Sequence, residues 1–221
     1  MTFQRARSAE QREERRRKIL DTALVMLDEM PVAEVSLNEL SRRVGLAKSN
    51  VLRYFESREA VLFELLDQAL GGWLPDVAAE LAAGVDPGRS VRERGDRLAA
   101  IVANSLAGRT VLCDLISAQA GVLEHNVSVD VVVRYKRSAL ASLDAMVELF
   151  ARHVPEVGAA AKQVCLLAMI LAGGLSTHCR PSASTLAAYA TDPALAELRI
   201  DLAASLEHGL ALLISGAVAR G

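Results

Sequence analysis

Apolar residues recur at the spacing of an α-helix along most of the chain, and no segment alternates in the way that strands do. The first such pattern predicts a helix from Ser8 to Glu29, charged in its first half and amphipathic in its second. Pro31 follows the end of this helix. The pattern therefore indicates a fold built of helices from its first residues onward.

Two short helices are predicted next, joined by a tight turn. Ser36 and Glu39 match the SxxE capping box, so the first should cover residues 37–44. Gly45 supplies the left-handed backbone of a tight turn, and the second short helix is predicted over 48–55. Apolar positions would join the two helices and leave polar side chains outside. This arrangement is typical of a helix-turn-helix.

The remainder of the chain predicts only helices. A helix capped by Ser57 should break or kink between residues 71 and 75, where two glycines and a proline surround the single tryptophan. Further helices are predicted over 90–107, 110–120, 128–154, 156–178 and 193–215, and residues 181–190 as a loop with at most a short turn. We expect an all-α protein of nine or ten helices. Its predicted domains are a three-helix helix-turn-helix domain, 1–56, and a larger helical domain, 57–221.

Composition narrows the class of protein. Hydrophobic residues make up 52% of the 221 positions and charged residues 24%, which excludes a wholly disordered or collagen-like chain. The start carries charges where a signal peptide needs apolar residues, and three scattered cysteines predict a reducing compartment, so we expect the cytoplasm. The four histidines and three cysteines lack metal-ligand spacing, and we expect neither metal nor cofactor.

The second short helix of the helix-turn-helix carries the candidate base contacts Lys48, Ser49, Asn50 and Arg53. Asn can bind an adenine edge and Arg a guanine edge with two hydrogen bonds, while Lys and Ser can serve bases or phosphates. The alternative is an ordinary solvated helix face. The N-terminal arm, from Arg5 to Lys18, is the most basic stretch of the chain and could contact phosphate or the minor groove, or could simply be solvated.

The segments RRKILDTALVMLDE and SLNELSRRVGLAKSNVLRYFESREAVL resemble the DNA-binding domain of TetR-type transcriptional regulators over residues 13 to 66. The resemblance implies backbone contacts by Ser36, Arg43, Tyr54 and Arg58. Leu52 departs from the family pattern, because it stands where members usually have a tyrosine that touches phosphate. Arg58 replaces the usual lysine and keeps its charge.

The resemblance also implies a homodimer held by the last two long helices, and those helices carry more apolar surface here than one core requires. The predicted interface residues are Ala168, Ala172, Leu195, Leu198, Leu202, Leu206, Leu210 and Leu213. The alternative is a monomer with unusually apolar helices.

The resemblance implies that the larger domain, 57–221, binds an effector as well as a second protomer, and we expect this effector to be small and mainly apolar. Residues that combine bulk with a polar group are the candidates for its pocket, although each could be plain core: Phe63, Leu66, Trp73, Cys113, Gln119, Tyr135, Met146, Phe150, Met169 and His178. The prediction is thus a repressor that binds a double-stranded palindromic operator as a homodimer and is released by its effector, with no membrane partner. One alternative is a helical DNA-binding protein without effector. An all-α enzyme is the weaker alternative, because the sequence contains no catalytic motif.

Overall fold

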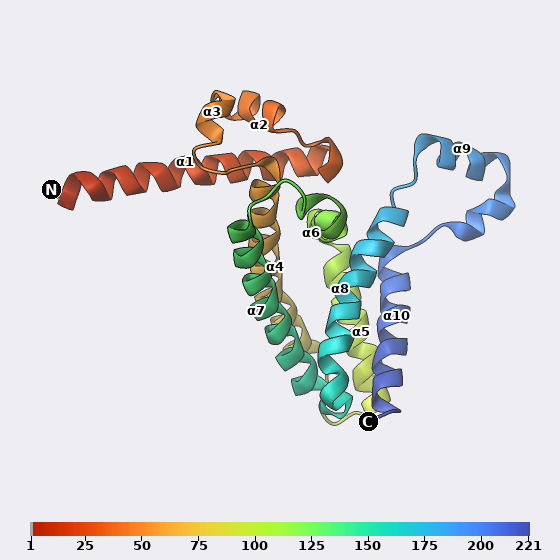
Figure 1. The fold of residues 1–221 in the computed structure, drawn as a ribbon. Helices are drawn as coiled ribbons and strands as arrows, with labels where there is room; N and C mark the ends of the chain where they lie inside the picture. Colours follow the sequence, from red (N-terminus) through yellow and green to blue (C-terminus); the bar gives the residue numbers. More distant parts are fainter. Residues whose placement is uncertain (1) are drawn as a thin grey trace. The chain divides into compact units, whose positions relative to one another are not determined.

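The computed structural model describes the backbone of residues 2–221 and the side chains from residue 9 onward, and it is helical throughout, with no strand in that range (Figure 1). Arg5 and Arg7 of the predicted basic arm therefore have side chains outside the described residues. The α-helices are α1 (Thr2–Glu29), α2 (Leu37–Val44), α3 (Lys48–Val51), α4 (Arg58–Gly84), α5 (Val91–Ala107), α6 (Thr110–Ala118), α7 (Val129–His153), α8 (Ala161–His178), α9 (Ala183–Thr191) and α10 (Leu202–Val218). Short 3₁₀ segments are η1 (Val32–Glu34), η3 (Pro155–Ala160) and η4 (Pro193–Leu198), and η2 (Gln119–Leu123) is a π-helical turn.

The chain forms two compact units. The first consists of Met1–Gln68 and Ala118–Tyr135, and the second of Ala69–Ser117 and Lys136–Gly221. The predicted domain boundary after residue 56 stays a prediction, and residues 118–135 are a segment of the first unit that lies far along the chain.

The first unit has a core made by α1, α2, α3 and the start of α4. Ile19 and Met26 of α1, Leu40 of α2, Val51 of α3 and Leu62 of α4 are all buried there. The spacing of Ile19 and Met26 by seven residues places both on the inner face of α1, as the amphipathic half of that helix predicts. Burying such side chains, at about 1.5 to 3 kcal/mol each, holds α2 and α3 on α1.

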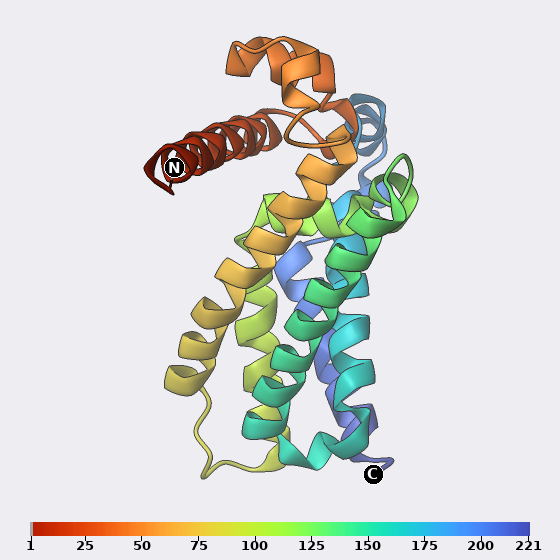
Figure 2. The same ribbon diagram turned by 60° about the vertical axis from the view of Figure 1, so that its left-hand side comes forward.

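The second unit is a bundle in which α10 packs along both α5 and α8 (Figure 2). Glycines permit the closest approaches. A Cβ on Gly95 of α5 would lie 3.0 Å from Cγ2 of Ile214 of α10, and one on Gly173 of α8 would lie 2.9 Å from Cγ2 of Ile116. Because a Cβ at either position would press into a neighbouring helix, small residues are required there.

Several helices agree closely with the sequence prediction. The predicted 37–44 helix is α2, the predicted 90–107 helix is α5 with a complete capping box at Ser90 and Glu93, and the predicted 128–154 helix is α7. The all-α fold class is confirmed. In each of these cases a capping serine next to the first apolar position marks the helix start.

Of the predicted break or kink between residues 71 and 75, the break is wrong, because α4 is continuous from Arg58 to Gly84 with Pro75 inside it, and the kink stays a prediction. Gly71 and Gly72 do not adopt positive φ, and Pro75 removes only one ladder hydrogen bond from the helix. Trp73 is buried, and its Nε1 donates a hydrogen bond to Oγ of Ser105 at 3.2 Å. This buried anchor stabilises the helix across the glycines and the proline.

The last third of the chain requires two further corrections. The predicted 156–178 helix begins only at Ala161, since Gly158 in η3 has φ 56° and ψ −135°. The predicted loop 181–190 is largely α9, capped by Ser182 Oγ, which accepts from Thr185 N–H at 3.2 Å. Residues 193–198 form η4, and α10 starts after Asp201, so the predicted 193–215 helix is split.

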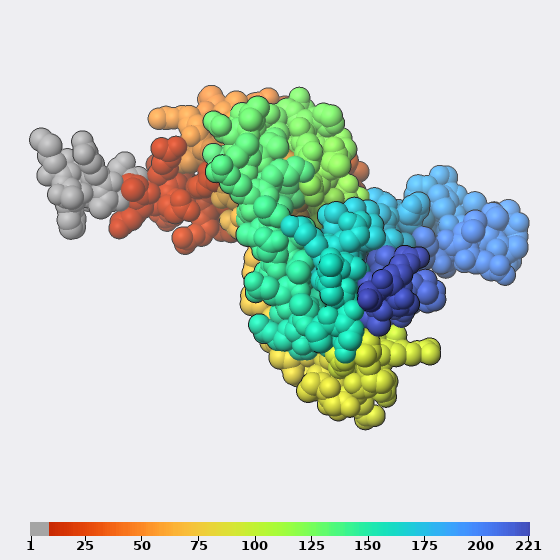
Figure 3. All heavy atoms as spheres, turned by 60° about the horizontal axis from the view of Figure 1, so that its bottom comes forward, coloured from red at the N-terminus to blue at the C-terminus, as the bar shows by residue number. Residues whose placement is uncertain are grey.

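Helix α9 and η4 together project from the rest of the second unit (Figure 3). They pack on each other, and neither contains a buried residue. An apolar nine-residue helix without a buried face has little to stabilise it within one protomer.

Candidate nucleic-acid interface

The turn of the helix-turn-helix is built by local signals. The N–H of Glu39 donates to Oγ of Ser36 at 3.1 Å, which caps α2. Gly45 closes α2 in the left-handed conformation at φ 76°, and the N–H of Leu46 then bonds to the carbonyl of Ser41 at 3.0 Å. The chain is thereby redirected into α3. The capping box predicted here is half formed, because the Glu39 carboxylate binds arginines instead.

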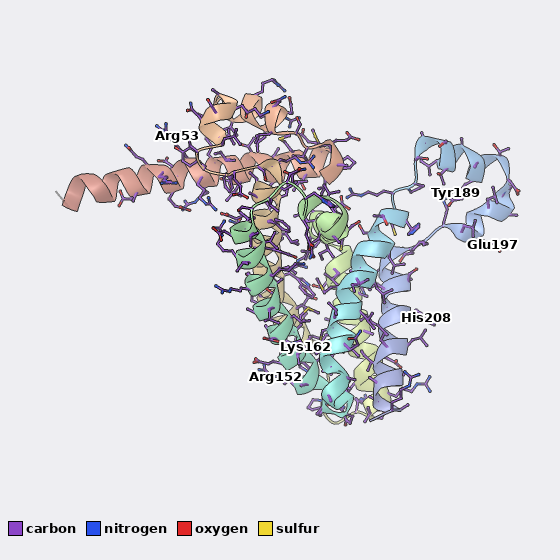
Figure 4. The ribbon with its side chains drawn as sticks, viewed as in Figure 1. Arg53, Arg152, Lys162, Tyr189, Glu197 and His208 are labelled. Atoms are coloured by element: carbon purple, nitrogen blue, oxygen red, sulfur yellow. The ribbon has the colours of Figure 1, made fainter. Side chains whose placement is uncertain are left out.

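Helix α3 presents a polar outer row. The helix is shorter than predicted, Lys48–Val51, and the chain continues in hydrogen-bonded turns to Phe55. Val51 and Phe55 are buried, whereas the four predicted base-contact side chains are exposed and form no hydrogen bond or ion pair with any described residue: Lys48, Ser49, Asn50 and Arg53. Arg53 extends outward from the end of α3 (Figure 4). The row is therefore free to bind a ligand.

Some of the residues predicted to contact the DNA backbone are exposed to solvent, whereas others are already bound to protein groups. Ser36 is exposed at the start of α2, and Tyr54 is partly exposed behind α3. Arg43 instead binds Glu29 at 2.5 Å and Glu39 at 2.8 Å. Leu52 is exposed and apolar, so it offers no hydrogen bond to a phosphate.

Arg58 connects the start of α4 to the end of η1 through hydrogen bonds. Its Nη1 donates to the carbonyl of Val35 at 2.9 Å, and its Nε donates to Glu59 at 3.1 Å. Glu59 is buried, so its carboxylate requires this partner. These bonds join the first turn of α4 to the end of η1. The expected phosphate contact by Arg58 conflicts with this arrangement, in which all three guanidinium nitrogens already have protein partners.

Glu39 is the most perturbed carboxylate of this surface. Hydrogen bonds from Arg42 and then Arg43 lower its pKa from 4.5 to about 2. The folded state thus binds this proton more weakly than the unfolded chain does. The resulting stabilisation is present above pH 4.5 and is lost as the pH falls towards 2.

We therefore predict a specific pH dependence for Glu39→Gln. The variant should be less stable than the wild type near neutral pH, and the difference should shrink between pH 4.5 and 2, because only the wild type loses an ionised partner of Arg42 and Arg43 there. Thermal unfolding across this range measures it. Parallel stability curves for the two proteins would contradict the assignment.

A cleft beside α3 was not anticipated. It has a volume of about 500 Å³ and is lined by Gln11, Arg12 and Arg15 of α1 together with Arg53 and Tyr54. The sequence shows the basic arm but not its approach to the end of α3. The spacing of residues 11, 12 and 15, which places them on one helical face, was the only signal that could have indicated it.

The ten predicted effector-pocket residues are divided between the two units. Phe63, Leu66, Gln119 and Tyr135 belong to the first, where the rings of Phe63 and Tyr135 stack at 4.3 Å. The others belong to the second: Trp73, Cys113, Met146, Phe150, Met169 and His178. Of these six, Met169 is half-buried and His178 is exposed, while the other four are buried. Burial raises the pKa of the Cys113 thiol to about 11, so this cysteine is an unreactive core residue at neutral pH.

The predicted interface residues are also divided. Ala168, Ala172, Leu206 and Leu210 are fully buried inside one protomer, so they offer no surface to a partner. Leu202 and Leu213 are half-buried on α10, whereas Leu195 and Leu198 lie on η4 and not on α10. The outward apolar residues of the two long helices are instead Leu166 and Ile170 of α8 and Leu212 of α10.

Among the residues that the structure describes, no group of three or more His, Cys, Asp or Glu side chains could hold a metal ion.

An all-helical chain whose capped α2, left-handed glycine turn and polar α3 form a helix-turn-helix is a DNA-binding protein of that class. Residues 19–65 match the family model of bacterial regulatory proteins of the tetR family, and residues 67–221 match the tetracyclin repressor-like C-terminal domain. The chain belongs to the TetR family of transcriptional regulators.

Individual transcriptional regulators are similar to this chain in sequence or in fold. The HTH-type transcriptional regulator EthR of Mycobacterium tuberculosis is 36% identical over 58 residues, which are 26% of this chain and 27% of that protein. A possible TetR family regulator from Streptomyces coelicolor A3(2) has the same fold at 20% identity, with a TM-score of 0.59 over 93% of this chain and 100% of that one. The regulator FadR from Bacillus subtilis, in complex with stearoyl-CoA, has a TM-score of 0.54 at 14% identity over 90% of this chain and 97% of that one.

Proposed function

We propose that the protein is a homodimeric repressor that places α3 of each protomer in the major groove of a palindromic operator. The observation that carries this proposal is the exposed row of Lys48, Ser49, Asn50 and Arg53, whose side chains have no hydrogen-bond or ion-pair partner among the described residues. In the same unit Arg16, Arg42, Arg43 and Arg58 are all ion-paired. Unpaired polar groups on the outer helix of a helix-turn-helix suit base recognition.

The dimer is supported by apolar surface on α8 and α10. Ile170 is 58% exposed and Leu212 is 60% exposed. Shallow grooves of about 650 Å³ and 500 Å³ flank Leu212, one shared with α5 and the other with η3 and α8. A ridge between two grooves is the shape that helix packing requires, and a second copy offers the same ridge and grooves about a twofold axis.

The apolar character of α8 supports the same proposal. With η3 it forms a segment, Pro155–His178, that is long and apolar enough for a membrane span by length and composition, and 39% of its most apolar stretch is buried. It packs against α10 within the second unit. We therefore assign its remaining apolar surface to a partner protomer and not to lipid, in a protein of the cytoplasm.

The effector is proposed to be a small molecule with a long apolar part. The second unit supplies apolar candidates at Trp73, Met146, Phe150 and Met169, and the similar FadR structure contains stearoyl-CoA. An effector that binds one conformation of the dimer better would shift its affinity for DNA, and DNA would weaken effector binding by the same factor. We therefore propose that the protein binds its effector and does not convert it chemically.

We predict that a long-chain acyl-CoA weakens operator binding. A coupling free energy of about 1 to 3 kcal/mol would raise the dissociation constant for the operator roughly 5- to 150-fold at saturation. Fluorescence anisotropy of labelled operator, titrated with stearoyl-CoA and with free CoA as the control, measures it. Unchanged operator affinity at saturating stearoyl-CoA would contradict this effector class while leaving DNA binding intact.

Specific DNA binding itself is tested with fragments of the source genome. A regulator should retain a few fragments at least about 1,000-fold more tightly than the bulk at physiological salt. Equal retention of all fragments would contradict the proposed function.

A further inference from the structure

We propose that the cleft between α1 and the end of α3 is a phosphate site that binds one phosphodiester of the DNA backbone. Its lining residues are Gln11, Arg12, Arg15, Arg53 and Tyr54. The inference rests on the proposed DNA-binding function and adds to it a contact made by the N-terminal half of α1.

The charge of the cleft points to an anion. Arg12, Arg15 and Arg53 form no ion pair with any described residue, and no carboxylate is among the described residues that line the cleft. Like charges held together repel each other, so a bound anion would relieve an unfavourable interaction. Guanidinium groups match phosphate oxygens with paired hydrogen bonds, and the amide of Gln11 and the hydroxyl of Tyr54 add further donors.

The walls of the cleft are fixed in advance by Arg16. Its Nη1 donates to the carbonyl of Tyr54 at 3.1 Å, and its Nε donates to Glu64 of α4 at 3.1 Å. Its guanidinium also lies over the ring of Phe55, 4.3 Å from the centroid. These contacts tie α1 to the end of α3 on the inner side, while Arg12 and Arg15 face the cleft. A preformed site avoids part of the ordering cost of binding.

The position of the cleft favours the DNA backbone over a free small anion. Arg53 belongs to the same exposed row as the proposed base contacts Lys48, Ser49 and Asn50, and it also lines the cleft, so a duplex read by α3 continues towards the cleft. Apart from Tyr54, the described residues that line the cleft include no aromatic or aliphatic side chain that would hold a base or a ligand tail. The cleft therefore suits a phosphate that belongs to a larger molecule.

The experiment compares Arg12→Ala, Arg15→Ala and the double variant with Arg17→Ala. Arg17 is exposed on the same helix but does not line the cleft, so it controls for the general charge of α1. Operator affinity is measured by gel shift over a series of salt concentrations. Because the site binds one phosphate, the double variant should lower the salt slope by about 1 per half-site and each single variant by part of that amount, and all three should weaken binding to all DNA sequences alike. Arg17→Ala should leave the slope unchanged.

Two outcomes would overturn the phosphate site. One is a double variant that keeps the wild-type slope on an operator that the wild type binds specifically. The other is an equal loss of slope in Arg17→Ala, which would indicate diffuse attraction by α1 and not a site. A wild type that binds no DNA sequence specifically would refute the proposed function, and with it this inference, whereas the first two outcomes refute the cleft alone. Equal thermal unfolding of all variants verifies that the fold is intact.

Discussion

Leu212→Glu is expected to convert the dimer into a folded monomer. The side chain is 60% exposed in one protomer, so the stability of the protomer itself should change little. Across a twofold interface the substitution removes two apolar contacts of about 1.5 to 3 kcal/mol each and places two carboxylates in an apolar contact. Together these two contacts amount to about 3 to 6 kcal/mol, so the dimer dissociation constant should rise roughly 100- to 20,000-fold. Sedimentation measures the change.

Two comparisons make this prediction specific. Leu140→Glu changes a leucine of α7 that is 49% exposed, and it should leave the dimer intact. Leu206→Glu should unfold the protomer, because Leu206 of α10 is 0% exposed and an unpaired buried charge costs a large part of a total stability of about 5 to 15 kcal/mol. A monomeric wild type at micromolar concentration would contradict the proposed dimer.

The second large effect is expected from the double change Lys48→Ala and Asn50→Ala. A good side-chain bond to a base edge contributes about 1 to 3 kcal/mol of discrimination, and a dimer on a palindrome makes that bond twice. If only one of the two side chains contacts a base, the double change removes that contact from both half-sites. Specific binding should then weaken by about 2 to 6 kcal/mol, or roughly 30- to 20,000-fold. Non-specific binding should change far less, since phosphate contacts supply most of it.

Arg42→Ala is the matched control for this experiment. Arg42 is an exposed cation of α2, and its guanidinium is held by Glu39 at 2.6 and 2.9 Å. Its removal should leave the ratio of specific to non-specific binding unchanged. If Arg42→Ala reduced that ratio as much as the double change does, the assignment of base reading to α3 would be wrong.

Features coded by neighbouring residues could be predicted from the sequence. Helices α2 and α5 have the predicted bounds, because Ser36 and Ser90 accept the backbone N–H groups that a helix start leaves free. The exposed polar row of α3 could be predicted from a few neighbouring residues, because the apolar Val51 faces the core and the polar Lys48 faces solvent. Helix-breaking residues mislead where tertiary packing stabilises the helix in spite of them. Pro75 is an example, because the buried Trp73 supports a continuous helix there.

Features that depend on distant residues could not be predicted. An apolar helix face can cover its own core or a partner, and the sequence of α10 alone does not separate the buried Leu206 and Leu210 from the exposed Leu212. Helix α9 escaped prediction because it buries nothing and so lacks an inward stripe, although Ser182 marks its start. The phosphate cleft requires α1 to pass the end of α3, and only the folded unit brings those residues together.

The central claim, that two copies of α3 read one palindromic site, is tested most directly by hydroxyl-radical footprinting of the complex on a specifically bound fragment. The account predicts two protected half-sites of inverted sequence, with centres about 10 base pairs, or a multiple of that, apart. Protection should vanish in both half-sites together in Lys48→Ala/Asn50→Ala. A single protected segment without inverted symmetry, or two segments that the double change leaves protected, would contradict the claim.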